Sequence, residues 1–350
     1  MPALKTEITE IVTGLAMFGF SDLRHGMGVR PPGLRNVGVD EYERLESAYR
    51  TGTYASLFER AWRNGSQFAA SPEGLRGRPP WVVEWKGGHR PPGYEQIPAD
   101  LRVDHVYLVS CKYGSNILTN SSPSNLFDRL LADRTEITGD WFAEVAGERY
   151  QAFYEAVRLE AGADLPTLVT DLDQDHREVL KRSVPRQLPG DLAVVYREFA
   201  EVVAAESSAR WAAQLGRKSA REQQVWRLLR LQSAPYFVLG ESADGQDMRY
   251  RVSTPWDLRE RYDFVGFDQS ADLSRGQPVV QWTARFKDRL DGRPHEVNGH
   301  VEIRWSHGRF AQVPEAKVYL DTPHHLVPGY VPVAAGRDET RLFDPAQRSN

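Results

Sequence analysis

Two extended runs of the sequence, residues 79–88 and 103–116, each carry a lysine near their end and an acidic residue nearby. Both runs are rich in Val, Tyr and Trp and are bounded by Pro, Gly and Asp, a composition typical of β-strands. Charged side chains in such strands are unfavourable unless they are paired, bind a metal or lie at an open end of a sheet. Glu84 in the first run, and Ser110 and Lys112 in the second, are therefore the first candidates for chemistry.

Side-chain alternation along the second run determines which of its residues can act together. It predicts that Asp104, Ser110 and Lys112 lie on one face of a strand, and that Cys111 lies on the other face as a buried structural thiol. Along a straight strand, Asp104 would lie roughly 26 Å from Lys112. The two side chains can therefore share an ion only if the strand begins after Asp104 and the chain bends there.

The first run supplies an acid that could lie closer. A hairpin that pairs residues 81–87 with residues 104–112 would bring Glu84 to the middle of the second strand. A modest change of register would then place Glu84 near Ser110 and Lys112. Carboxylates can hold one or two divalent ions that neutralise a phosphate, while a lysine orients or deprotonates the attacking water. This arrangement therefore suits phosphodiester hydrolysis assisted by divalent ions.

Residues 54–134 resemble the core of the PD-(D/E)XK nuclease superfamily, which consists of a helix, three strands, a helix and a strand. The tripeptide Ser110-Cys111-Lys112, at the end of a strand, corresponds to the (D/E)XK motif, with Ser110 where an acid is expected. The resemblance implies a DNA endonuclease of the restriction or defence type. The assignment to restriction or defence rests only on analogy with what such folds often do.

The resemblance also implies which acids accompany the lysine. The upstream aspartate would be Asp104 or Asp100, and Glu59 matches the glutamate that the first helix often contributes. Two further Glu-X-Lys tripeptides, at residues 84–86 and 315–317, compete with this assignment. The expected catalytic residues are Glu84, Asp104, Ser110 and Lys112, and the expected ligands of Mg²⁺ or Mn²⁺ are Glu59, Glu84 and Asp104.

Polar and basic segments are candidates for contact with DNA. The small polar residues that follow Lys112, and a helix start predicted at Ser122 and Pro123, offer hydroxyl, amide and backbone donors that suit a phosphate. Residues 210–230 contain six basic residues and one acidic residue, which predicts a basic helix able to follow a phosphate backbone. The residues expected to bind DNA are Ser115, Asn116, Arg217, Lys218 and Arg221.

Changes of periodicity along the chain predict an α+β fold. Helical spacing of apolar residues extends from about residue 140 to 232, and short extended runs separated by Gly, Asp and Pro follow residue 235. The expected parts are an α/β nuclease-like core at residues 1–139 with an irregular arm at 22–38, a helical region at 140–234, an antiparallel β-rich domain at 235–335 and a disordered tail at 336–350.

Composition limits the class of protein. The 350-residue chain has a net charge of −4 and one cysteine, which excludes an intrachain disulfide and a cysteine zinc cluster within one chain. No apolar run is long enough to span a bilayer and no secretory signal is recognisable, so we expect a cytoplasmic protein without membrane association. DNA is the expected partner, and a homodimer is left open.

Two other functions are consistent with the sequence. Ser110 in the acid position and the acidic net charge favour a catalytically inactive nuclease-like module that binds nucleic acid or a partner protein. Alternatively, an unrelated interaction protein would bind through its C-terminal sheet, with Trp282 and Trp305 exposed. A metal-dependent cleavage assay separates the nuclease from both.

Overall fold

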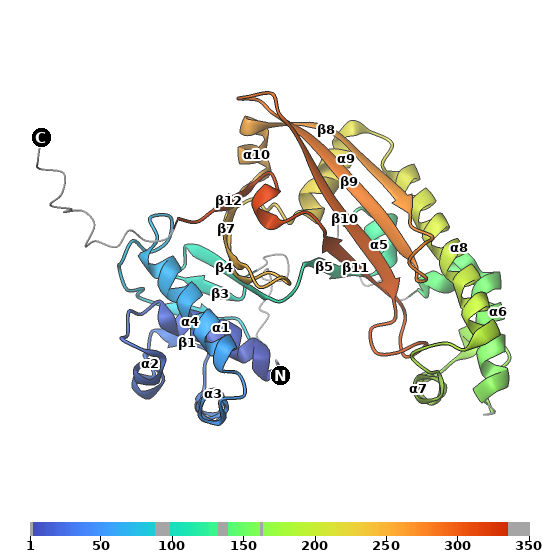
Figure 1. Ribbon diagram of the computed structural model, residues 1–350, viewed down its shortest axis with the longest axis horizontal. Helices are drawn as coiled ribbons and strands as arrows, with labels where there is room; N and C mark the ends of the chain where they lie inside the picture. Colours follow the sequence, from blue (N-terminus) through green and yellow to red (C-terminus); the bar gives the residue numbers. More distant parts are fainter. Residues whose placement is uncertain (1–2, 88–98, 132–138, 162–163, 335–350) are drawn as a thin grey trace, which may run out of the picture. The chain divides into compact units, whose positions relative to one another are not determined.

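The protein has an α+β fold with two sheets, each in its own compact unit (Figure 1). The computed structural model describes residues 3–87, 99–131, 139–161 and 164–334. Unit 1 comprises Met1–Ser115, Leu231–Glu260 and Pro328–Asn350, and unit 2 comprises Asn116–Arg230 and Arg261–Val327. The chain therefore leaves unit 1 twice and returns to it twice. The sequence analysis, by contrast, predicts parts that follow one another along the chain.

Unit 1 is built on a mixed sheet with the strand order β1-β2-β3-β4-β6-β7-β12. Strands β1 and β2 are parallel, as are β4 and β6, while the other neighbours are antiparallel. Its elements are α1 (Leu4–Ala16), α2 (Leu23–Val29), β1 (Leu34–Arg35), α3 (Val39–Thr51), α4 (Ala55–Ala70), β2 (Val83–Trp85), β3 (Leu101–Val103), β4 (Tyr107–Tyr113), β6 (Tyr236–Glu241), β7 (Asp247–Val252), α10 (Pro255–Arg261) and β12 (Tyr330–Pro332).

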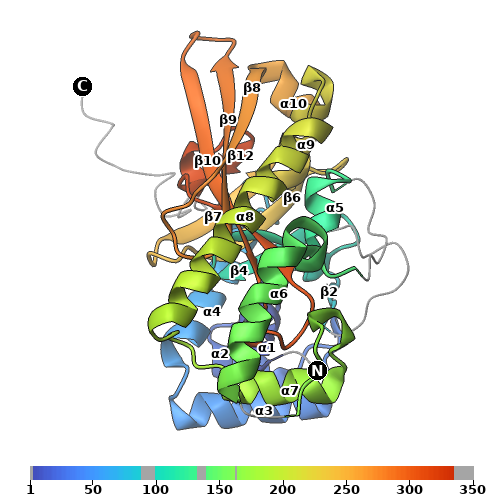
Figure 2. The ribbon, with the colours of Figure 1, turned by 90° about the vertical axis from the view of Figure 1, so that its right-hand side faces the viewer.

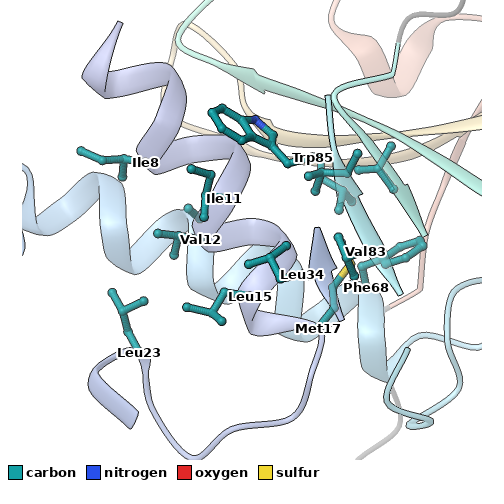
Figure 3. Packing of buried hydrophobic residues seen from close by; sticks show 14 of the residues in the cluster. Ile8, Ile11, Val12, Leu15, Met17, Leu23, Leu34, Phe68, Val83 and Trp85 are labelled. Carbon is teal, nitrogen blue, oxygen red and sulfur yellow. The ribbon is translucent and has the colours of Figure 1, made fainter. Parts of the chain in front are cut away.

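Helix α1 lies at the centre of the unit 1 core, where it packs against α4 and against β2 and β4 of the sheet. Its apolar side chains Ile8, Ile11 and Leu15 are fully buried, and Figure 3 shows them packed close to Val83 and Trp85 of β2. The helix also buries two glutamates, and each of them has a partner: Glu7 pairs with Arg44, and Glu10 accepts the Trp85 indole N–H. The helices cover one face of the sheet, so the residues that face away from them are the ones left for a site.

The segment 22–38, expected to be an irregular arm, contains a short helix and a short strand. Asp22 caps α2 by accepting a hydrogen bond from the His25 backbone N–H at 2.8 Å, and Leu34 and Arg35 form the edge strand β1. The irregular appearance of this segment comes from its prolines and glycines, which are compatible with a one-turn helix start and a two-residue strand. The prediction of irregular structure is therefore wrong for α2 and β1 and holds for the residues between and after them.

Unit 2 contains an antiparallel sheet with the strand order β5-β11-β10-β9-β8. The long helices α6 and α8 lie side by side, and α8 also packs on β8 and β9 (Figure 2). The elements of unit 2 are β5 (Ile117–Ser121), α5 (Pro123–Phe127), α6 (Trp141–Ala161), the 3-10 turn η1 (Val169–Asp171), α7 (Gln174–Ser183), α8 (Gly190–Gln214), α9 (Lys218–Leu228), β8 (Tyr262–Ala271), β9 (Val279–Asp288), β10 (Pro294–Arg304), β11 (Glu315–Leu320) and η2 (His324–Leu326).

Aromatic side chains fill the space between the helices and the sheet of unit 2. Phe142 packs on Phe199 and on Trp305, with ring centroids 5.0 and 4.7 Å apart. Trp282 is 1% exposed and Trp305 is 8% exposed. Both were expected to be exposed for partner binding, and that expectation is wrong because both indoles belong to this core.

The helical and extended segments expected from periodicity are confirmed, whereas their grouping is different. Helices α6 to α9 occupy the predicted helical region, and β9 and β10 occupy residues 279–304. Strands β6 and β7, however, complete the sheet of unit 1. The proposed tail at 336–350 lies outside the described residues. Among the helices that the structure describes, none has the length and apolarity needed to cross a lipid bilayer.

Candidate active site

The strands around Lys112 form a three-stranded meander rather than the hairpin that was expected. Glu84 pairs with Arg102 of β3, and Arg102 in turn pairs with Leu108 of β4. Asp104 and His105 both have a left-handed backbone, with φ of 50° and 59°, which is the conformation of a tight turn between antiparallel strands. Residues 81–87 therefore do not pair with residues 104–112, because β3 lies between them.

Strand β4 presents Ser110 and Lys112 away from the helices. Val109 belongs to the buried core and Cys111 packs against it, so the alternation of a strand places Ser110 and Lys112 on the opposite face. The predicted division of these side chains between the two faces is confirmed.

Glu84 is held by Arg102 and His105. The Arg102 guanidinium donates from Nε and Nη2 to its two carboxylate oxygens at 2.5 and 2.9 Å, and His105 Nδ1 lies 3.2 Å away. The hydrogen bonds from Arg102 lower the pKa of Glu84 from its ordinary value. The strand register separates the Cα atoms of Glu84 and Lys112 by roughly 16 Å, two strands across and four residues along. Glu84 therefore does not join Ser110 and Lys112.

A Glu84→Gln variant tests this structural role. Because the pKa of Glu84 is lowered on folding, its carboxylate stabilises the fold above about pH 4.5, and this contribution is lost as the pH falls through the lowered value. We expect the variant to lose about 1 kcal/mol of unfolding free energy at neutral pH. Urea unfolding measured across pH should show that the difference in unfolding free energy between the variant and the wild type becomes smaller below about pH 4.5. An equal loss at all pH values would contradict the ion pair.

The carboxylate of Asp104 stabilises the turn. It accepts the backbone N–H groups of Trp81 and Val82 at 2.7 and 3.1 Å and pairs with Arg78 at 2.5 Å. The chain does bend at Asp104, as the sequence required for a shared ion. The bend, however, leaves Asp104 beside Tyr107, the first residue of β4. Lys112 lies about 17 Å farther along this strand, too far to share an ion with Asp104.

Asp100 is the acid that the fold brings to Ser110. One of its carboxylate oxygens, Oδ2, accepts the Cys111 backbone N–H at 2.6 Å and the Ser110 hydroxyl at 3.2 Å. The Lys86 backbone N–H donates to the Asp100 carbonyl at 2.8 Å, which ties the start of β3 to the end of β2. Of the two upstream aspartates that the resemblance left open, Asp100 is the one beside the tripeptide.

The end of β4 that carries Lys112 is fixed from both sides. A Cβ atom at Gly240 would lie 1.5 Å from the Lys112 carbonyl oxygen, so only glycine lets β6 approach β4 at this point. Fully buried Asn64 donates to the Gly240 carbonyl at 3.0 Å and to the Tyr113 hydroxyl at 3.1 Å. The Thr13 hydroxyl lies 3.2 Å from the same Tyr113 oxygen. This network positions the backbone on either side of the lysine.

Cys111 has the character of a structural thiol. Burial raises the pKa of its thiol, and the negative charges of Asp100 and Glu10 raise it further. Glu10 is itself buried on α1 and accepts the Trp85 indole N–H at 2.6 Å. A thiol that stays protonated at neutral pH is a poor nucleophile, so Cys111 is unsuited to nucleophilic chemistry.

The remaining predicted site residues lie elsewhere. Glu59 is exposed on α4, on the helical side of the sheet, and the sheet separates it from Lys112. Ser115 and Asn116 follow β4 where the chain passes from unit 1 to unit 2. Ser122 caps α5 by accepting the Asn125 backbone N–H at 3.3 Å, as the sequence predicted, but this helix has only five residues.

The basic segment at 210–230 is two helices, and several of its arginines have structural roles. Arg210 pairs with Asp128 and Glu144, and Arg221 donates to the Leu215 carbonyl at the end of α8. Arg217 and Lys218 are exposed at the start of α9. The segment is therefore not a continuous basic face, and its contribution to DNA binding stays a prediction.

The donors beside Lys112 fit a hard divalent cation. Mg²⁺ prefers oxygen ligands and is usually bound by one or two carboxylates, with water and substrate phosphate completing its coordination. Asp100 supplies a carboxylate and Ser110 a hydroxyl oxygen on adjacent strands. Among the residues that the structure describes, no group of three or more His, Cys, Asp or Glu side chains is arranged to hold a metal, so such an ion would take its other ligands from water and phosphate.

The candidate site therefore consists of Asp100, which contacts Ser110, and of Lys112 on the same face of β4. Comparisons of the chain with protein-family models, with curated proteins and with solved structures found no match.

Proposed function

We propose that unit 1 is a divalent-metal-dependent endonuclease that hydrolyses phosphodiester bonds in DNA at Asp100, Ser110 and Lys112. The observation that carries this proposal is the contact of the Asp100 carboxylate with Ser110 and with the Cys111 N–H. Asp100 directly precedes β3, and strand alternation puts Lys112 on the same face of β4 as Ser110. Glu84 and Asp104, by contrast, are assigned to ion pairs that hold the meander together.

Each residue has a distinct part in the proposed reaction. A Mg²⁺ or Mn²⁺ ion bound at Asp100 and Ser110 would neutralise phosphate charge and acidify a water ligand. The hydrogen bond from the Cys111 N–H orients the Asp100 carboxylate before any ligand binds. Lys112 binds a non-bridging phosphate oxygen through its ammonium group and orients the attacking water.

The connectivity of unit 1 supports the proposal. Helix α4 precedes the meander β2-β3-β4, and β6 then joins β4 in parallel. This follows the order helix, three strands and a further strand, with the first segment of unit 2 in place of the second helix. A role in restriction or defence in the cytoplasm is part of the proposal only by analogy with such folds.

The test is a cleavage assay with the full chain on plasmid and on single-stranded DNA. We expect nicking or linearisation with Mg²⁺ or Mn²⁺ and none when EDTA removes the metal. Heat-inactivated protein controls for contaminating nuclease. If no substrate is cleaved with either metal, the endonuclease proposal is wrong.

A second candidate function is a nuclease-like module that binds DNA without cleaving it. Ser110 favours it, because a serine stands where the motif has an acid and therefore adds no second carboxylate beside Asp100. Retention of DNA in a metal-independent binding assay, combined with no cleavage, is the result that this alternative predicts.

A further inference from the structure

An exposed aromatic pair lies at the turn end of the meander. Trp81 is 71% exposed, and Val106, which follows His105 in the turn, is 74% exposed. The Trp81 and His105 rings meet edge to face, with centroids 5.9 Å apart and planes at 81°. Large apolar side chains in such a group are unusual on a surface and mark a contact site.

The backbone holds this pair in place before any ligand arrives. Asp104 accepts the Trp81 N–H at 2.7 Å, and the left-handed backbone of Asp104 and His105 directs the turn toward Trp81. Non-glycine residues in this backbone region are uncommon and cost free energy. The aromatic surface is therefore preorganised, which lowers the entropy lost on binding.

The charges around the pair suit a polyanion. Both nearby carboxylates are neutralised, Asp104 by Arg78 and Glu84 by Arg102. The Arg78 side chain is 56% exposed and uses one of its nitrogens for the Asp104 pair, whereas a guanidinium carries five N–H donors. A phosphate beside Trp81 would thus meet donors rather than unpaired acids.

We infer that Trp81 and His105 form a stacking platform for an unpaired nucleobase of single-stranded DNA. This inference rests on the proposed function, because it places the platform on the path of the substrate. His105 joins the platform to Glu84, which lies on the same face of the sheet as Ser110 and Lys112. The distance along β4 from the turn end to these two residues is roughly 10–17 Å. A stacked strand rises about 3.4 Å per nucleotide, so three to five nucleotides would connect the platform to the proposed site.

The test measures binding of the full chain to a short labelled single-stranded oligonucleotide in EDTA, by fluorescence anisotropy. Stacking on one aromatic residue predicts that Trp81→Ala weakens binding roughly 5- to 150-fold, and that Trp81→Phe retains most of the affinity. Trp256 is the matched control, since it is 73% exposed on α10, and Trp256→Ala should bind like the wild type. An abasic nucleotide at the contacted position should weaken the wild type and leave Trp81→Ala unchanged.

Cleavage measured separately in Mg²⁺ distinguishes failure of the platform from failure of the proposed function. Loss of affinity in Trp81→Ala without any cleavage by the wild type would support the platform and overturn the endonuclease. Normal affinity of Trp81→Ala, an equal loss in Trp256→Ala, or no binding of single-stranded DNA by the wild type would each overturn the platform. Any of these results would leave a protein partner as the occupant of the Trp81 surface.

Discussion

Replacing Lys112 by alanine is expected to lower metal-dependent DNA cleavage at least about a hundredfold, the scale of a lost proton-transfer or orienting group. The variant removes the ammonium group that binds the phosphate and orients water. It should fold, because Asn64, Tyr113 and Gly240 fix the β4 backbone on either side of the lysine. Initial rates of plasmid nicking and the thermal unfolding curve of the same preparation provide the measurement.

Lys317→Ala is the matched control for this variant. Lys317 ends the competing tripeptide at residues 315–317, and it lies on β11 of unit 2, 3.9 Å from Glu315. If Lys317 rather than Lys112 were catalytic, its loss would abolish cleavage and Lys112→Ala would cleave at the wild-type rate. That pattern would move the site to unit 2 and contradict the assignment.

Gly65→Ala should destabilise unit 1 by about 3 kcal/mol or more, at the upper end of overpacking effects. A Cβ atom at this position of α4 would lie 2.1 Å from the Thr13 carbonyl oxygen and 2.8 Å from the Ala16 Cβ, both on α1. Backbone atoms of a neighbouring helix cannot move aside as a flexible side chain can, so α1 and α4 must separate. Urea denaturation followed by circular dichroism measures the loss.

Gly28→Ala is the control for a glycine that has open space around it. Gly28 lies in α2, and a Cβ atom there would meet nothing within 4 Å. Alanine is favoured over glycine in a helix, so this variant should be neutral or more stable by up to about 1 kcal/mol. Equal destabilisation by both substitutions would show that the contact between α1 and α4 is not the cause.

The elements with clear periodicity could be predicted from the sequence. Alternation along β4 correctly divided Ser110 and Lys112 from Cys111, since a strand with one buried face leaves little freedom of register. The α+β class followed from the helical spacing after residue 140 and the extended runs after residue 235. These are local signals, and they do not depend on which strands pair.

The pairing of strands could not be predicted in the same way. Strands β2 and β3 have three residues each, too few to show a pattern, and the residues before β3 gave no strand signal. The alternation over residues 103–113 predicts a continuous strand through Asp104 and His105, although both residue types favour the left-handed backbone of a turn. That preference is a signal of a turn between β3 and β4. It also favours Asp100 over Asp104 as the aspartate beside Ser110 and Lys112.

Burial of the unit 2 tryptophans also depends on distant residues. Trp282 packs over Gly299, where a Cβ atom would lie 2.2 Å from the indole ring. The space for the indole is made by a glycine on the next strand, β10. The local sequence around Trp282 contains no sign of this. The burial of Trp282 therefore depends on the packing of the sheet and could not be predicted from its neighbours in the sequence.

Direct binding of Mn²⁺ to the full chain tests the assignment of Asp100 most directly. Electron paramagnetic resonance of free Mn²⁺, titrated with protein in the presence of a non-hydrolysable oligonucleotide, measures the bound fraction without requiring turnover. We predict that the wild type and Asp104→Asn bind Mn²⁺ with similar affinity, because Asp104 belongs to the turn. Asp100→Asn should lose most of the binding, since the amide removes the carboxylate beside Ser110. Undiminished binding by Asp100→Asn, or its loss in Asp104→Asn alone, would contradict the site.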